Sequence, residues 1–200
     1  IPNLIGNIPD WKKIYKIAKR FDIKIIEDSA DTLGAEIGKK STGFYSDISI
    51  TSFYGSHVIS CAGNVGILLT NNKDYFSRAK VLRSWGRMST LIKDSENIHK
   101  RLSIKLKGFD YDRKFVFSEI GYNFEPSEIG ASFGIEQLKK FKYFSKLRNR
   151  NFNLHMNFFG KLDRYFIVPE VRKNVKTNFL AYPIIIKNNS LFSRKNFQIY

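Results

Sequence analysis

A short apolar segment that ends in two acidic residues constrains the fold most. Residues 10–21 (DWKKIYKIAKRF) place apolar side chains at helical spacing, with Asp10 as the N-cap. Residues 23–30 (IKIIEDSA) then predict a short buried strand that carries Glu27 and Asp28 at its carboxyl end. A helix followed by such a strand is an α/β unit, and functional groups in these sheets gather at the carboxyl ends of strands.

The rest of the chain continues this pattern. It predicts further strands at 47–53 and 66–71, helices at 72–86 and 125–162, and strand-like segments at 165–171 and 178–187. Residues 88–118 are polar and irregular, which indicates a surface excursion that acts as a lid or an oligomer contact. We therefore expect an α/β protein with a second domain that starts near residue 165.

Both ends of the sequence indicate an internal fragment of a longer protein. Residue 1 is Ile, and the first ten residues (IPNLIGNIPD) are typical of the exit from a strand. The last residues (FSRKNFQIY) stop inside a predicted helix start. Part of any site is therefore expected to lie outside these 200 residues.

The net charge of +16 raises the question of nucleic-acid binding. The basic residues are spread through every segment, and no zinc-finger spacing, RNP-like strand or helix-turn-helix is evident. A solvated basic surface is therefore favoured over a nucleic-acid site, and an anionic small-molecule substrate is also compatible with this charge.

Cysteine, histidine and hydropathy patterns exclude other classes of site. Cys61 alone provides neither a disulfide framework nor a multi-cysteine metal site, and it fits a reducing cytoplasm. His57, His99 and His155 lack metal-ligand spacing, so no metal site is expected. No apolar run approaches the length of a membrane span.

Three polar residues indicate a functional site only when they are considered together. Taken singly, Asp28 is explained as a turn or cap residue, Ser52 as a strand serine and His57 as a packed histidine. Together they place an acid at the end of one strand, a hydroxyl at the end of another, and an imidazole five residues later. This combination resembles a pyridoxal-phosphate site, in which an acid pairs with the ring nitrogen and a hydroxyl binds the phosphate.

The resemblance extends to four longer segments: EDSADTLGA (27–35), SDISITSFYGSH (46–57), GYNFEPSEIGASFGIEQLKK (121–140) and RNRNF (148–152). In this order they resemble the DegT/DnrJ/StrS family of nucleotide-sugar aminotransferases. The resemblance implies the fold type I architecture of pyridoxal-phosphate enzymes, with a central mixed sheet flanked by helices. It implies that residues 1–164 are part of the large cofactor-binding domain with its long connecting helix. Residues 165–200 are then the start of a smaller C-terminal α/β domain.

The resemblance also implies roles for individual residues. Asp28 matches the aspartate that pairs with the pyridine nitrogen, and Asp31 stands where the family usually has a glutamine against the ring. Ser52 matches the phosphate-binding serine, and Asn123 matches an asparagine that reaches the phosphate of a neighbouring subunit's cofactor. A homodimer with shared active sites is therefore expected.

His57 stands where the aminotransferases carry the lysine that bonds covalently to the cofactor. An imidazole has no primary amine, so it cannot form that bond, but it can accept and donate a proton near neutral pH. Non-covalent pyridoxamine phosphate suits such a site. A histidine here resembles the branch of nucleotide-linked 4-keto-6-deoxyhexose 3-dehydratases, in which it takes a proton from the cofactor methylene and the C3 hydroxyl leaves.

The expected activity is therefore C3 dehydration of a nucleotide-linked 4-keto-6-deoxy sugar, in the biosynthesis of deoxysugars and lipopolysaccharide O-antigen in the cytoplasm. Cys61 alone cannot hold an iron–sulfur cluster, so the resemblance favours branch members that recharge the cofactor from glutamate. Glu125 stands where many aminotransferases have an arginine, so no sugar contact is assigned there.

Two alternatives remain open. The first is a nucleotide-sugar aminotransferase that relies on a lysine other than position 57, although Lys39, Lys40 and Lys73 all lie outside the motif. The second is a cofactor-binding paralogue without catalysis that serves as a regulator.

Overall fold

The first helix forms where the sequence predicts it. In the computed structural model, which describes residues 1–188 and 190–200, helix α1 (Trp11–Arg20) follows Asp10, whose side chain accepts a hydrogen bond from the Lys13 amide at 3.3 Å. This bond satisfies one of the free amides at the start of the helix. The core beside α1 consists of five buried residues, Ile8, Trp11, Ala18, Ile25 and Ala35.

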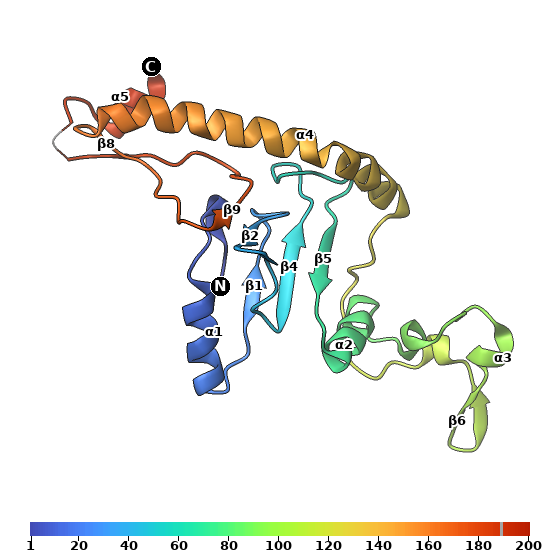
Figure 1. The fold of residues 1–200 in the computed structure, drawn as a ribbon. Helices are drawn as coiled ribbons and strands as arrows, with labels where there is room; N and C mark the ends of the chain where they lie inside the picture. Colours follow the sequence, from blue (N-terminus) through green and yellow to red (C-terminus); the bar gives the residue numbers. More distant parts are fainter. Residues whose placement is uncertain (189) are drawn as a thin grey trace. The chain divides into compact units, whose positions relative to one another are not determined.

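A three-stranded sheet carries two of the five predicted site residues, Asp28 and Ser52 (Figure 1). Its strands are β1 (Ile26–Asp28), β4 (Ile48–Ser52) and β5 (Gly66–Leu69), in the spatial order β1-β4-β5. β1 and β4 are parallel, with Asp28 opposite Ile50, whereas β5 runs in the opposite direction. The sheet is therefore mixed, as predicted, and Asp28 and Ser52 end neighbouring parallel strands at the same edge.

β1 begins later than the predicted strand at residues 23–30. Asp22 has a left-handed backbone, with φ of 48°, and the Ile23 amide donates to the Ala18 carbonyl at 2.8 Å. These features close the end of α1 with a turn, so the chain is free to pair with β4 only from Ile26 onward. On its other side, β1 forms a parallel bridge between Asp28 and Pro2.

Two small sheets consist of strands of only two residues each. One has the order β3-β2-β9, formed by β3 (Lys40–Ser41), β2 (Glu36–Ile37) and β9 (Val175–Lys176); the other pairs β8 (Phe166–Ile167) with β10 (Ile185–Ile186). β2 and β3 were missed by the sequence analysis because two residues show no periodicity. β8 and β10 are short parts of the strands predicted at 165–171 and 178–187. Pro169 and Pro183 lack an amide proton, which limits pairing there.

The long predicted helix is confirmed as α4 (Glu128–Phe159), and a 3-10 turn (Gly160–Leu162) follows it. Two glycines bring the first turns of α4 against the loop that follows β4. A Cβ atom at Gly130 would clash with the Ala62 carbonyl, and one at Gly134 would clash with Cys61 Sγ. Further along α4, the Phe152 ring stacks on Phe179 with a centroid distance of 3.5 Å. Helix α5 (Arg194–Ile199) ends the described chain.

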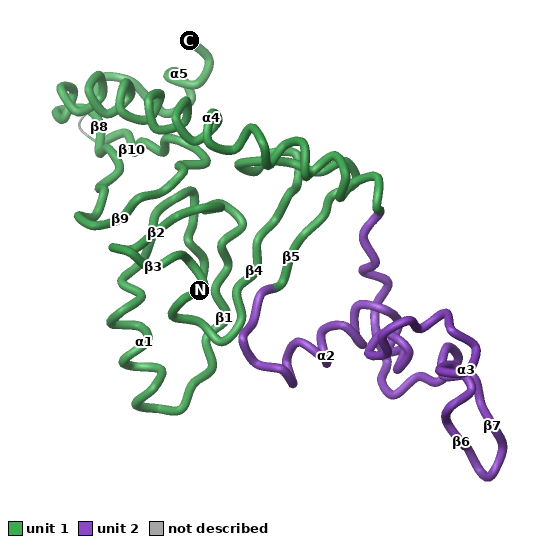
Figure 2. The backbone as a smooth tube through the Cα atoms, turned by 45° about the vertical axis from the view of Figure 1, so that its right-hand side comes forward, with its two compact units in different colours: residues 1–68, 128–200 green, residues 69–127 purple. Residues whose placement is uncertain are grey.

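The chain divides into two compact units, residues 1–68 with 128–200, and residues 69–127 (Figure 2). The second unit contains α2 (Lys73–Arg83), where the sequence predicts a helix, and Gly86 follows it with φ of +88°. Within residues 88–118 the structure adds α3 (Ile98–Arg101) and a hairpin of β6 (Ile104–Leu106) and β7 (Phe109–Tyr111). The role of this excursion as a lid or oligomer contact stays a prediction, as does the domain division after residue 164.

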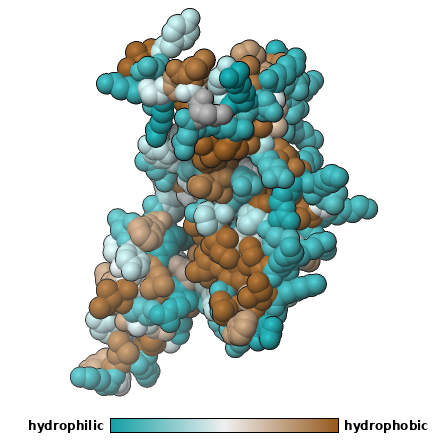
Figure 3. Space-filling view, turned by 90° about the vertical axis from the view of Figure 1, so that its left-hand side faces the viewer, coloured by the Kyte–Doolittle hydropathy of each residue, from teal (hydrophilic) through white to brown (hydrophobic). Residues whose placement is uncertain are grey.

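Many large apolar side chains are exposed on the described residues. They include Ile26 and Ile50 on the sheet, and Ile129, Leu138 and Phe158 on α4. Figure 3 shows one face of the protein, on which apolar side chains form patches among polar ones. None of the described helices combines the length and the apolar character that crossing a membrane requires.

A buried carboxylate joins β1 to three other segments. Glu27 is 1% exposed, and its Oε1 accepts hydrogen bonds from Asn3 Nδ2 and Ser29 Oγ, both at 2.8 Å. Its Oε2 accepts from the Gly43 amide at 2.8 Å and from Ser46 Oγ at 3.3 Å. Because a buried carboxylate is costly unless its oxygens are hydrogen bonded, these four donors make the burial of Glu27 tolerable.

Replacement of Glu27 should therefore destabilise the protein. We expect Glu27→Gln to lower the free energy of unfolding by about 1–3 kcal/mol. The amide nitrogen of glutamine would replace one carboxylate oxygen, and it cannot accept the hydrogen bonds that this oxygen now accepts. Urea unfolding followed by tryptophan fluorescence would measure the loss, since Trp11 donates to Asn3 in the same network. Glu136→Gln, on the exposed side of α4, is the matched control. Equal midpoints for the two variants would contradict the role of Glu27.

Candidate active site

Asp28 presents a carboxylate oxygen at the end of β1. Its Oδ1 accepts a hydrogen bond from the Ala30 amide at 3.0 Å, which holds the side chain in a turn. Within residues 1–188 and 190–200, no donor is hydrogen bonded to Oδ2. The side chain is half-buried, so this oxygen can form a charge-assisted hydrogen bond with a cationic group of a ligand.

Ser52 ends the neighbouring strand with a hydroxyl. Its Oγ accepts a hydrogen bond from the Tyr54 amide at 3.2 Å, which fixes the side chain as the chain leaves β4. No acceptor for the hydroxyl proton is present in the described part of the chain. Ser52 can therefore donate this proton to an anionic group of a ligand.

His57 lies in a loop that is fixed at both ends. The Phe53 amide donates to the Val65 carbonyl and the Cys61 amide donates to the Phe53 carbonyl, both at 2.8 Å. Within the loop the His57 amide donates to the Tyr54 carbonyl at 3.0 Å. Its imidazole is 17% exposed, so it is largely shielded from water but open on one side.

Asp31 faces His57 across the ends of the two strands. The His57 Nε2 atom lies 3.5 Å from Asp31 Oδ1, and both side chains are mostly buried. The other carboxylate oxygen, Oδ2, accepts a hydrogen bond from the Ile5 amide at 2.8 Å. His57 Nδ1 is buried and makes no hydrogen bond to any described residue. The pair was not foreseen from the sequence, which placed Asp31 only against a cofactor ring; that role stays a prediction.

Asn123 belongs to the second compact unit, residues 69–127. Its backbone forms an antiparallel bridge with Ser84, just after α2. The predicted function of its side chain, on the cofactor of a neighbouring subunit, stays a prediction.

Two contributors to the site were missed from the sequence. Arg148 on α4 donates to the carbonyl of His57 at 3.5 Å, and burial lowers the pKa of its guanidinium. Its only sequence signal was its place in the RNRNF segment. Ile5 holds Asp31 through its amide from a left-handed backbone, with φ of 59°, which is unusual for a β-branched residue. No local pattern in the sequence marks this position.

Cys61 lies in the structure as a small apolar residue. It packs against Gly134 of α4, and burial raises the pKa of its thiol. A raised pKa leaves less thiolate at neutral pH, and the thiolate is the nucleophilic form. Cys61 is therefore not a candidate nucleophile.

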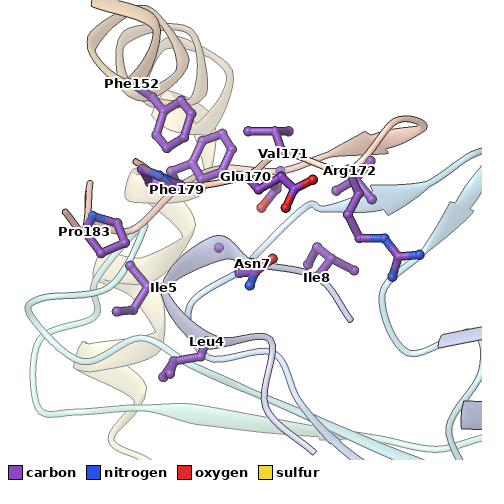
Figure 4. A pocket seen from close by; sticks show the side chains of 14 residues that line it. Leu4, Ile5, Asn7, Ile8, Phe152, Glu170, Val171, Arg172, Phe179 and Pro183 are labelled. Atoms are coloured by element: carbon purple, nitrogen blue, oxygen red, sulfur yellow. The ribbon is translucent and has the colours of Figure 1, made fainter. Parts of the chain in front are cut away.

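A separate apolar cavity of about 220 Å³ lies between the N-terminal turn and the segment after α4 (Figure 4). Its walls include Ile5, Phe152 and Phe179. None of the residues predicted for the site lines it, and only Ile5 belongs to both regions.

The parallel β1–β4 pair carries Asp28 and Ser52 at its carboxyl edge, as the resemblance to fold type I enzymes of the pyridoxal-phosphate class implies. Comparison with known proteins identifies the family. The model of the DegT/DnrJ/EryC1/StrS aminotransferase family matches residues 1–199. The chain belongs to this family, as its motifs predict.

Individual relatives include both reaction types of the family. A dTDP-4-dehydro-2,6-dideoxy-D-glucose 3-dehydratase from Saccharopolyspora spinosa is 30% identical over 97% of this chain and 42% of its own length. A UDP-4-amino-4,6-dideoxy-N-acetyl-beta-L-altrosamine transaminase from Campylobacter jejuni is 29% identical over 90% of the chain and 42% of its length. The chain thus spans less than half of these curated relatives.

A solved structure shows the same fold. The GDP-4-keto-6-deoxy-D-mannose-3-dehydratase of E. coli, with bound hydrated PLP, superposes with a TM-score of 0.80 and 28% identity. The match covers 98% of this chain and 48% of the E. coli chain.

The raised pKa of Cys61 predicts slow alkylation. At pH 7 iodoacetamide should modify Cys61 more slowly in the folded protein than in urea, and the difference should shrink as the pH rises toward the raised pKa, because thiolate then forms in both states. Peptide mass spectrometry over time measures the rate at this residue. Equal rates in the folded and unfolded protein at pH 7 would contradict the packed position of Cys61.

Proposed function

We propose that this chain is part of a pyridoxamine-phosphate-dependent 3-dehydratase that acts on a nucleotide-linked 4-keto-6-deoxy sugar. The observation that carries the proposal is the imidazole of His57, which faces Asp31 at the carboxyl edge of the sheet in place of an amine. The similarity to sugar 3-dehydratases supports it.

The donor set at the sheet edge fits the cofactor. Asp28 offers a carboxylate oxygen to a protonated pyridine nitrogen, and Ser52 offers a hydroxyl to a phosphate. When bound, pyridoxamine phosphate supplies a primary amine that condenses with a ketone and a ring that withdraws electrons. Asp28 keeps that ring protonated and Ser52 holds its phosphate, so the two strand ends orient it.

His57 moves the proton. Nε2 of its imidazole faces Asp31, and Nδ1 has no hydrogen-bond partner among the described residues. With the cofactor bound, the imidazole would accept a proton from the carbon next to the cofactor amine, and the Asp31 carboxylate would stabilise the positive charge that the imidazole gains. His57 then gives this proton to the departing C3 hydroxyl, which leaves as water. The half-buried loop limits access of bulk water to these steps.

An aminotransferase is the second candidate, and the Campylobacter relative favours it. It would need a lysine to hold the cofactor covalently. In the part of the chain that the structure describes, no lysine amine is hydrogen bonded or ion paired with Asp28, Asp31, Ser52 or His57. Lys40 lies instead over the Phe44 ring, at 4.0 Å from its centroid. A regulator without catalysis is less well supported, because His57 is present beside Asp28 and Ser52, and a regulator needs no base.

The proposal also includes the oligomeric state of the enzyme, its amine donor and the pathway of its product. The enzyme is a homodimer in which Asn123 of one subunit completes the site of the other, and glutamate recharges the cofactor. The product enters deoxysugar and lipopolysaccharide biosynthesis in the cytoplasm. The basic surface of the chain suits a substrate that carries a diphosphate.

Replacement of His57 tests its role as the base. In the full-length protein, His57→Asn should bind pyridoxamine phosphate with unchanged affinity but lose dehydration, because an amide cannot accept the proton. The measurement is exchange of the cofactor methylene proton in deuterated water with the keto sugar present, beside product mass. His99→Asn, in the second unit, is the matched control. Wild-type exchange in His57→Asn would remove His57 from the mechanism.

Borohydride separates the dehydratase from the aminotransferase. Reduction of the full-length protein loaded with pyridoxal phosphate should leave the wild type unlabelled, because position 57 carries no amine. His57→Lys should retain the cofactor after reduction, and the label should map to the peptide that contains residue 57. A reduced cofactor attached to another lysine of the wild type would favour the aminotransferase.

A further inference from the structure

A closed ring of contacts returns to the His57–Asp31 pair. The Ile5 amide donates to the Asp31 carboxylate, and the Ile5 carbonyl accepts from the Leu180 amide. The Arg148 guanidinium donates both to the Leu180 carbonyl and to the carbonyl of His57. We propose that Arg148 is a positioning residue that sets the geometry of His57 and Asp31 through this ring. The effect of Arg148 on catalysis rests on the proposed function, whereas its effect on the loop that contains His57 does not.

One side of the ring runs through the N-terminal turn. The Ile5 amide donates to Asp31 Oδ2 at 2.8 Å, and the Leu180 amide donates to the Ile5 carbonyl at 3.2 Å. Gly6 has φ of +97°, and a Cβ atom there would lie 2.8 Å from Phe179 Cα. The turn and the segment at residues 179–180 are therefore packed backbone to backbone, so a shift of one displaces the other.

The other side of the ring depends on one guanidinium. Arg148 Nη1 donates to the carbonyls of Phe179 and Leu180, both at 3.2 Å, and Nη2 donates to that of His57 at 3.5 Å. No carboxylate forms an ion pair with Arg148 among the residues described. A planar fork of donors can reach carbonyls on two segments at once, whereas the single ammonium of a lysine cannot keep the same geometry.

The arrangement has a direct consequence for His57. Its loop is bonded to Val65, the residue before β5, and to itself within residues 53–61, but Arg148 provides the side-chain hydrogen bond from α4 to the carbonyl of His57 itself. The separation of 3.5 Å between Nε2 and Oδ1 is at the limit of a hydrogen bond, so a small displacement of either segment weakens the pair. Proton transfer is sensitive to such displacements.

The loop is tested first, in the full-length protein without cofactor. In Arg148→Met, amide hydrogen exchange across residues 54–61 should be several-fold faster, because the loop loses a long hydrogen bond from α4, with β1 and β4 unchanged. Arg148→Lys should recover only part of the protection. Arg150→Met, an exposed arginine on the same helix, should exchange as the wild type does. Unchanged exchange in Arg148→Met would overturn the proposal.

The second readout is the imidazole. The side-chain NMR signals of His57 should shift in Arg148→Met, and they should shift in the same direction in Gly6→Ala, which perturbs the ring from its other side. With cofactor and keto sugar, Arg148→Met should lower kcat while the dissociation constant of pyridoxamine phosphate stays unchanged. Exchange and NMR changes without any effect on a measurable kcat would overturn the catalytic part. Absence of dehydration in the wild type would overturn the proposed function but leave the loop result standing.

Discussion

The buried carboxylate of Glu27 is the interaction on which the placement of the site depends. A charged group that is 1% exposed must be fully hydrogen bonded, and here the donors come from the N-terminal segment, the residue after β1 and the turn at residues 43–46. Because successive side chains of a strand point to opposite sides, Glu27 directed into the interior leaves Asp28 directed away from it. The four hydrogen bonds that make the burial of Glu27 tolerable therefore also orient the Asp28 carboxylate toward a ligand.

Glu27 fixes only the strand, and the reactive groups lie beyond strand ends. Asp31 and His57 are on two different loops, and each is held from a segment far away in the sequence: the Ile5 amide donates to the Asp31 side chain, and the Arg148 guanidinium donates to the His57 carbonyl. A rigid sheet with adjustable loops at its edge is a common way to build a site, because the scaffold changes little while the loops set the chemistry.

The sequence predicted the parts of the structure that depend on local pattern. Helix α1 follows its N-cap, α4 follows a Pro-Ser start, and Asp28 and Ser52 each lie at a strand end because polar residues there end an apolar run. The contact between His57 and Asp31 was not predictable in this way, because it depends on the register of β1 against β4 and on two turns. The sheet β3-β2-β9 was missed for a related reason: its strands have only two residues each, and β2 pairs on one side with Val175 and Lys176, which lie far away in the sequence. The position of Asn123 relative to a partner's cofactor depends on assembly, which local pattern does not encode.

The two glycines of α4 have an effect far from their own contacts. Gly130 and Gly134 let the first turns of the helix meet the main chain of Ala62 and the sulfur of Cys61 without a side chain between them, which allows one rotational setting of the helix about its axis. Arg148 follows Gly130 by eighteen residues, and at about 3.6 residues per turn this separation is five full turns. The guanidinium therefore emerges on the same side as the glycine contact. A helix that could roll by a quarter turn would direct Arg148 away from the loop of His57, so two missing methyl groups near the start of α4 determine the direction of a charge five turns further along.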